Sequence, residues 1–161
     1  MSHDQADGGR DEAGRAADAM DRALRSAARM HADDRVVKAL GISIGEVAPG
    51  RATARMRVAA DMVNGHGIAH GGYLFLLADA AFAYACNTHG PVTVARQCEI
   101  TFLSPARAGD DLTAVAAERV RIERNGIYDV SVRRANGDVL AEMRGHSRTV
   151  RPGPGGTDET A

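Results

Sequence analysis

A single acidic residue lies inside the most apolar stretch of the sequence. Asp79 is the only charged side chain between Gly72 and Asn87, a segment rich in Leu, Ala and Phe. Such composition predicts a helix that is buried on all sides, where a carboxylate is costly unless it is paired or neutralised. Asp79 is therefore either a structural group, held by backbone amides or an arginine, or a tuned base or nucleophile in a cleft.

The residues before this helix favour the second interpretation. The segment Asn64-Gly65-His66-Gly67-Ile68-Ala69-His70-Gly71-Gly72 leads straight into it. Gly71 and Gly72 leave the first backbone amides open at the positive end of the helix dipole, where they can receive a polarised carbonyl oxygen. Asp79 lies roughly 10 to 12 Å further along the helix, too far for one chain to place both groups on one carbonyl. The spacing thus suggests a composite site, with Asp79 of one chain facing Gly71 of another across antiparallel helices.

Other residue patterns in the sequence do not predict a dinucleotide site, a metal site or a serine nucleophile. The Gly65-x-Gly67 pattern has no parallel βαβ unit around it, which excludes a dinucleotide fingerprint. His66 and His70 are four residues apart without a third ligand at a recognisable spacing, so we expect no metal site. Ser104 has no nucleophile-elbow context, which argues against a Ser-His-Asp hydrolase.

The elements that must position these groups follow from the hydrophobic pattern. Residues 1–20 and 151–161 lack large apolar runs and are expected to be disordered tails of a single domain, 21–150. A short amphipathic helix is expected over 21–30 and the buried helix over 72–87, with Asn-Gly pairs at 125–126 and 136–137 as hairpin signals. Strands are expected at 42–47, 53–58, 92–103, 112–122, 127–132 and 139–148. One long buried helix against an antiparallel sheet predicts an α+β fold.

Composition limits the classes of function. The 161 residues fit one domain, and a formal net charge of −1 gives no reason to expect a nucleic-acid partner. The sequence contains no uncharged apolar run of about 18 residues, so we expect no membrane span. The N-terminus does not resemble a secretory signal. Cys86 and Cys98 are expected to be reduced thiols, Cys86 a packed core residue, in a cytoplasmic protein.

Three segments of the chain match a known pattern: Asn64-Gly65-His66-Gly67-x-x-His70-Gly71-Gly72, Ala78-Asp79-x-Ala81-Phe82-Ala83-Tyr84-Ala85-Cys86-Asn87 and Phe102-Leu103-x-Pro105. Through them the chain resembles, over residues 27–150, the phenylacetic-acid-degradation (PaaI-type) hotdog thioesterases. It implies a hotdog fold whose central helix is wrapped by a curved antiparallel sheet, in a homodimer that pairs again into a homotetramer. It also implies hydrolysis of phenylacetyl-CoA or hydroxyphenylacetyl-CoA. Coenzyme A is part of the substrate, and we expect neither a metal nor an organic cofactor.

The resemblance also implies roles for single residues. Asp79 matches the catalytic carboxylate, acting as nucleophile or as base for water, and Gly71 matches the oxyanion-hole amide. Asn64 matches the residue that orients water or the thioester, and His70 matches the histidine of the His-Gly-Gly turn. Some relatives carry a serine that assists water on the strand after the helix. Ala95 stands at that position here, so we expect no such helper.

The remaining expected contacts concern substrate binding. Gly72, Phe75 and Leu76 on the helix are expected to contact the acyl group. Arg144 and Arg148 are candidate ligands for the phosphates of CoA, although exposed arginines are usually solvated surface.

Two competing functions stay open on sequence grounds. A non-catalytic acyl-CoA-binding module would bind the ligand without turnover, and it usually brings an additional domain that this chain has no room for. An enoyl-CoA hydratase of hotdog fold would carry an Asp and His pair within a hydratase-type loop, a motif that we do not find here.

Overall fold

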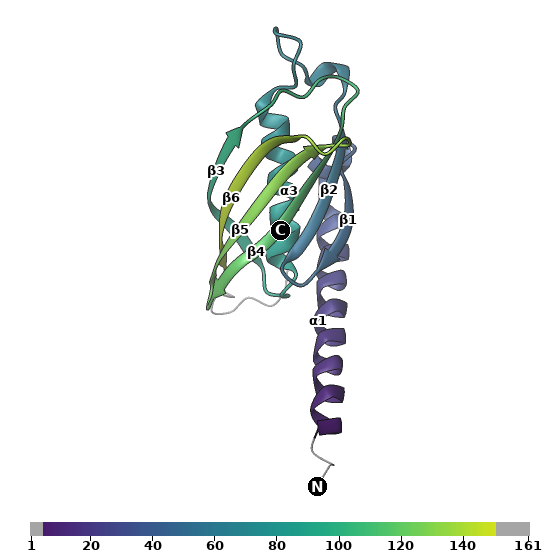
Figure 1. Ribbon diagram of the computed structural model, residues 1–161, viewed down its shortest axis with the longest axis vertical. Helices are drawn as coiled ribbons and strands as arrows, with labels where there is room; N and C mark the ends of the chain where they lie inside the picture. Colours follow the sequence, from purple (N-terminus) through teal and green to yellow (C-terminus); the bar gives the residue numbers. More distant parts are fainter. Residues whose placement is uncertain (1–4, 151–161) are drawn as a thin grey trace.

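The computed structural model describes residues 5–150, which form a single curved sheet around one long helix (Figure 1). The helical elements are α1 (Gln5–Asp33), α2 (Arg35–Ala39), a 3-10 turn (Ala60–Met62) and α3 (Gly71–Asn87). The strands are β1 (Ser43–Ala48), β2 (Arg51–Arg57), β3 (Thr93–Phe102), β4 (Asp111–Ile122), β5 (Asn125–Arg134) and β6 (Val139–Thr149). This confirms the α+β fold class predicted from the sequence.

The sheet is antiparallel throughout, in the order β1-β2-β4-β5-β6-β3. The strand that follows α3 along the chain therefore lies at one edge, and β1 lies at the other. In Figure 1 the sheet curves around α3, so that the helix crosses its concave face. The position of β3 matters for function, because an edge strand beside the central helix leaves one flank of that helix uncovered.

Packing of α3 against the sheet explains why this helix is apolar. Phe82 is fully buried, and its ring centroid lies 5.4 Å from that of Tyr128 on β5. On β6, Gly145 makes room for the Phe82 ring, since a Cβ there would lie 2.9 Å from three ring atoms. Burial of one such ring stabilises the fold by about 1.5–3 kcal/mol.

Polar side chains fix the end of α3. Asn87 accepts a hydrogen bond from the Thr93 N–H at 2.9 Å and donates one to the Thr93 carbonyl at 2.7 Å. Thr88 accepts from the Gly50 N–H at 2.8 Å and donates to the Ala85 carbonyl at 2.7 Å. These bonds satisfy backbone groups at the helix end and connect α3 to β3 and to the β1–β2 turn.

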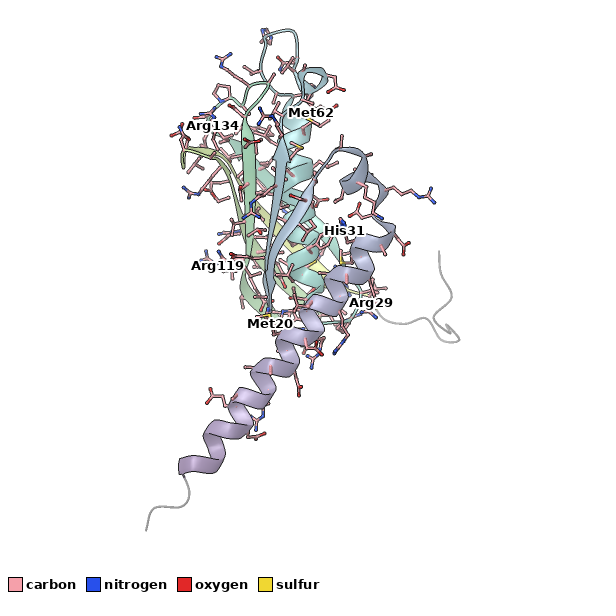
Figure 2. The ribbon with its side chains drawn as sticks, turned by 90° about the vertical axis from the view of Figure 1, so that its right-hand side faces the viewer. Met20, Arg29, His31, Met62, Arg119 and Arg134 are labelled. Atoms are coloured by element: carbon pink, nitrogen blue, oxygen red, sulfur yellow. The ribbon has the colours of Figure 1, made fainter. Side chains whose placement is uncertain are left out.

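The N-terminal region differs from the prediction. The segment up to residue 20 was expected to be disordered, but α1 is continuous from Gln5 to Asp33 and extends beyond the sheet (Figures 1 and 2). Alanine-rich composition favours a helix even without large apolar side chains, and Asp–Arg pairs four residues apart, Asp11–Arg15 and Asp21–Arg25, add support. Residues 1–4 and the expected tail at 151–161 lie outside the described residues.

One hairpin turn also lies two residues from its expected place. The turn between β4 and β5 is formed by Glu123 and Arg124, with Glu123 at φ 53°, and Asn125 already pairs with Ile122. Gly126 serves close packing instead, because a Cβ there would lie 2.7 Å from the hydroxyl of Ser147. The other Asn-Gly pair, at 136–137, does form the expected turn.

Among the described residues, no helix combines the length and the apolar character that crossing a membrane requires.

Candidate active site

Asp79 lies on the one flank of α3 that the sheet does not cover. Most of the helix is buried, but every fourth residue along one stripe is only half-buried: Gly71, Phe75, Asp79 and Ala83, with Leu76 beside them. Residues four apart project from the same face of a helix. The predicted site residues Gly71, Phe75, Leu76 and Asp79 therefore share one exposed stripe.

The Asp79 carboxylate has no compensating partner in the described chain. Burial raises its pKa above the ordinary value of 3.8, and no hydrogen bond or cation among the described residues offsets that effect. The alternative of a structural carboxylate, bonded to backbone amides or an arginine, is thus not what the fold of one chain shows. An unpartnered carboxylate at the edge of a core is typical of groups that carry out chemistry.

The start of α3 presents a backbone amide that is available to a ligand. His70 caps the helix, its Nδ1 accepting from the Gly72 N–H at 3.3 Å. The His70 N–H donates to the Met62 carbonyl and the Tyr73 N–H donates to the His70 carbonyl, at 2.8 and 2.9 Å. Between them, the N–H of Gly71 has no acceptor within the described residues. It can therefore polarise a carbonyl oxygen of a substrate.

The loop before the helix is held rigidly in place. The Ala69 N–H donates to the Ala106 carbonyl at 2.8 Å, and the Asn64 N–H donates to the Ile68 carbonyl at 2.8 Å. The side-chain oxygen of Asn64 accepts from the His66 N–H at 2.9 Å. This leaves the side-chain NH2 group of Asn64 as its donor toward a substrate or a water molecule. Met62, labelled in Figure 2, marks this end of the molecule.

Sequence reasoning missed the wall of the site that β3 contributes. Cys98, Ile100 and Phe102 alternate along the strand and face α3, since they pair with buried residues of β6. Burial raises the pKa of the Cys98 thiol, and the charge of Asp79 raises it further. The alternation of apolar side chains in 98–102 was the available signal, but only the pairing of β3 with β6 shows which side faces the helix.

Arg144 and Arg148 lie elsewhere. They alternate on β6 with the buried residues Met143, Gly145 and Ser147, so they project from the sheet face opposite α3. Arg144 is also engaged, donating to Asp129 at 2.7 Å. One chain therefore does not bring these two arginines together with Asp79 and Gly71.

The surroundings of His66 and His70 are not those of a metal-ligand pair. Both are exposed, and the Nδ1 atom of His70 is already used as the helix cap. In the chain from residue 5 to residue 150, no three His, Cys, Asp or Glu side chains are grouped so that they could hold an ion.

Within one chain, the two reactive groups lie at separate points of the same stripe. Eight residues separate Gly71 from Asp79, about 12 Å along a helix. A carboxylate in an apolar setting and an amide at a helix N-terminus are what hydrolysis of an activated carbonyl requires, one for attack and one for the developing oxyanion.

Known proteins resemble this chain in sequence and in fold. The sequence model of the thioesterase superfamily matches residues 66–141. The acyl-coenzyme A thioesterase PaaI of Escherichia coli is 44% identical over 129 residues, covering 80% of this chain and 92% of that protein. The solved structure of the E. coli PaaI protein superposes with a TM-score of 0.81 at 43% identity, covering 82% of this chain and 96% of that one. The structure of a mutant of the phenylacetic acid degradation protein PaaI from Thermus thermophilus superposes with a TM-score of 0.70 at 38% identity. The match covers 73% of this chain and 100% of that one. The chain therefore belongs to the thioesterase superfamily, as a hotdog-fold thioester hydrolase of the PaaI type.

Proposed function

We propose that this enzyme hydrolyses phenylacetyl-CoA or hydroxyphenylacetyl-CoA to the free acid and CoA. The observation that carries the proposal is the unpartnered carboxylate of Asp79 on the same helix stripe as the free amide of Gly71. The 44% identity to the acyl-coenzyme A thioesterase PaaI of E. coli, a protein of the phenylacetic acid degradation operon, supports the substrate class.

In the proposed reaction, the Gly71 N–H donates to the carbonyl oxygen of the thioester and stabilises the oxyanion that forms there. Asp79 either attacks the carbonyl carbon itself or removes a proton from an attacking water. Asn64 orients the water or the thioester through its side-chain NH2 group, while His70 holds the turn. The carbon–sulfur bond then breaks, and CoA leaves as a thiolate that takes up a proton. Where Asp79 is the nucleophile, this step leaves an acyl–Asp79 anhydride, which water hydrolyses to release the free acid and restore the carboxylate. This chemistry requires neither a metal nor an organic cofactor.

The site is proposed to form between two copies of the chain. Among residues 5–150, β6 is the one strand bonded to β3, so the outer edge of β3 presents backbone groups to which another strand can add. Val94 and Leu103 add exposed apolar side chains at this edge. Pairing of two β3 strands would bring α3 of each copy alongside the other, so that Asp79 of one chain can face Gly71 of its partner. A further pairing of such dimers gives the homotetramer.

The contacts to the substrate follow from the same stripe. Gly72, Phe75 and Leu76 are proposed to contact the acyl group beside the reacting carbonyl. Arg144 and Arg148 are proposed ligands of the CoA phosphates. Because both lie on the outer face of the sheet, they would contact the part of CoA that extends away from α3. Cytoplasmic location is proposed because Cys86 and Cys98 are both free thiols.

Release of free thiol from a panel of thioesters tests the proposal. The panel contains phenylacetyl-CoA, hydroxyphenylacetyl-CoA, benzoyl-CoA and straight-chain acyl-CoAs, each assayed with the full-length protein. Preferential hydrolysis of the arylacetyl substrates is the expected result. Tight binding of these thioesters without thiol release would indicate an acyl-CoA-binding module instead of an enzyme. Preferential hydrolysis of straight-chain substrates would overturn the substrate assignment.

A further inference from the structure

The aromatic ring of Phe102 lies directly against the backbone of Gly71. A Cβ placed on Gly71 would meet the Cζ, Cε1 and Cε2 atoms of that ring at 3.0, 3.3 and 3.4 Å. Phe102 is the last residue of β3, and the following Leu103 N–H donates to the Leu140 carbonyl at 2.8 Å. The backbone that carries the ring is therefore fixed to the sheet.

The contact belongs to a longer correspondence between β3 and α3. The stretch from Cys98 to Phe102 spans about 13 Å of strand, and the stretch from Asp79 to Gly71 spans about 12 Å of helix. Phe102 lies at Gly71, and Cys98 pairs with Gly145 of β6, which packs against the Phe82 ring three residues beyond Asp79. The inner row of β3 thus forms a wall along the whole distance between the two reactive groups.

Phe102 differs from its neighbour in this wall because its ring remains half exposed. Half of its surface is accessible, whereas Ile100 packs against the core cluster. An apolar ring with one part against Gly71 and another open to solvent offers a surface beside the amide that binds the carbonyl oxygen. An acyl group attached to that carbonyl must extend from this point.

We infer that Phe102 determines the acyl specificity of the enzyme by contacting the substrate's acyl group beside the oxyanion amide. The inference rests on the proposed thioesterase function and adds a residue that selects the substrate. An aryl group one methylene away from the carbonyl reaches the Phe102 ring and packs against it edge-to-face or offset. Aromatic pairs of this kind gain affinity beyond simple burial, whereas a linear chain gains only the burial.

Replacement of Phe102 by leucine tests this role, because leucine keeps the apolar volume and removes the ring. The measured quantity is selectivity, the ratio of kcat/KM for phenylacetyl-CoA to that for hexanoyl-CoA. Phe102→Leu is expected to lower this ratio about 3- to 10-fold. Phe102→Tyr keeps a ring and is expected to retain the ratio of the wild type. Val36→Ala removes an exposed apolar side chain from α2, outside both β3 and α3, and is expected to leave the ratio unchanged.

A binding measurement separates this inference from the proposed function. Phenethyl-CoA and hexyl-CoA are thioethers that cannot be hydrolysed, and their dissociation constants follow from calorimetric titration. A lower preference for phenethyl-CoA in Phe102→Leu supports the inference even in a protein that shows no turnover. Equal preferences in wild type and Phe102→Leu, with both proteins folded by circular dichroism, would overturn it even if phenylacetyl-CoA is hydrolysed rapidly.

Discussion

Replacement of Asp79 by asparagine should change activity and stability in opposite directions. Asparagine keeps the shape of the side chain and removes its charge. Because burial raises the pKa of Asp79 without a compensating partner in the described chain, the ionised carboxylate destabilises the folded state at neutral pH. Each unit by which that pKa is raised corresponds to at most about 1.4 kcal/mol, and solvent screening of this half-buried side chain lowers the cost. Relief of about 1 kcal/mol raises the Tm of a domain of this size by about 2–4 °C.

Activity should fall steeply in the same variant. Loss of the attacking group is expected to lower kcat/KM by a factor of about 100 or more, which corresponds to about 2.7 kcal/mol of transition-state stabilisation. Thiol release from phenylacetyl-CoA measures the first effect and a thermal melt measures the second. Asp61→Asn is the matched control, since Asp61 is an exposed carboxylate outside α3 and should affect neither quantity.

The pH dependence gives the stability effect a second signature. The Asp79 carboxyl, whose pKa is raised above 3.8 in the folded state by burial, is protonated at low pH. Under those conditions no charge is buried, so the side chain does not lower the free energy of unfolding. The cost appears as pH rises through the raised pKa. The Tm advantage of Asp79→Asn should therefore be absent well below pH 3.8 and present at neutral pH. The wild-type rate should fall as pH decreases through the same raised pKa, because only the ionised carboxylate can act.

A structural carboxylate would behave in the reverse way. An Asp79→Asn protein with a lower Tm at neutral pH and a kcat/KM close to that of the wild type would refute the reasoning. It would show that the carboxylate is held by hydrogen bonds that the fold of a single chain does not provide.

Three further changes test other contacts. Gly71→Ala places a methyl group 3.0 Å from an aromatic ring and should displace the oxyanion amide, lowering kcat by about 10- to 100-fold in the thiol-release assay with a much smaller change in KM. Gly145→Ala brings a Cβ to 2.9 Å from the Phe82 ring, and this overpacking should destabilise the fold by about 1–3 kcal/mol, measured by calorimetry. Glu118→Gln weakens the hydrogen bond that the Tyr128 hydroxyl donates to Glu118 at 2.6 Å. Because the pKa of Glu118 is lowered in the fold, the stabilisation by its carboxylate should be present above pH 4.5 and disappear as pH falls through the lowered pKa. Thermal melts of wild type and variant should therefore differ at pH 7 and converge in acid.

Local pattern was sufficient to predict the core of this fold. The length and composition of the apolar run around Asp79 favour a buried helix, and the segments after it are typical of strands. The three strands β4, β5 and β6 lie close to the expected ranges, and buried residues alternate along much of each strand. The family motif then supplied roles for Gly71 and Asn64 that spacing alone left open.

The missed features depend on contacts between distant segments or on helix propensity without burial. The start of α1 at Gln5 reflects alanine content and charge pairs, which a search for apolar side chains does not detect. The turn at Glu123 and Arg124 is set by the pairing of β4 with β5, in which Gly126 is needed for packing. The contact of Phe102 with the helix start required the crossover of β3 to the edge beside β6.

The two thiols near Asp79 raise a question of chemical compatibility. A thiolate beside a bound thioester can attack its carbonyl, displace CoA and leave the acyl group on the protein. Burial raises the pKa of Cys86 to about 12, and the charge of Asp79 contributes to that increase. The Cys86 thiol is therefore protonated at neutral pH. The same carboxylate also raises the pKa of Cys98, after the larger effect of burial. The group proposed to attack the substrate thereby helps to keep the neighbouring sulfur atoms protonated, so that hydrolysis proceeds without self-acylation of the enzyme.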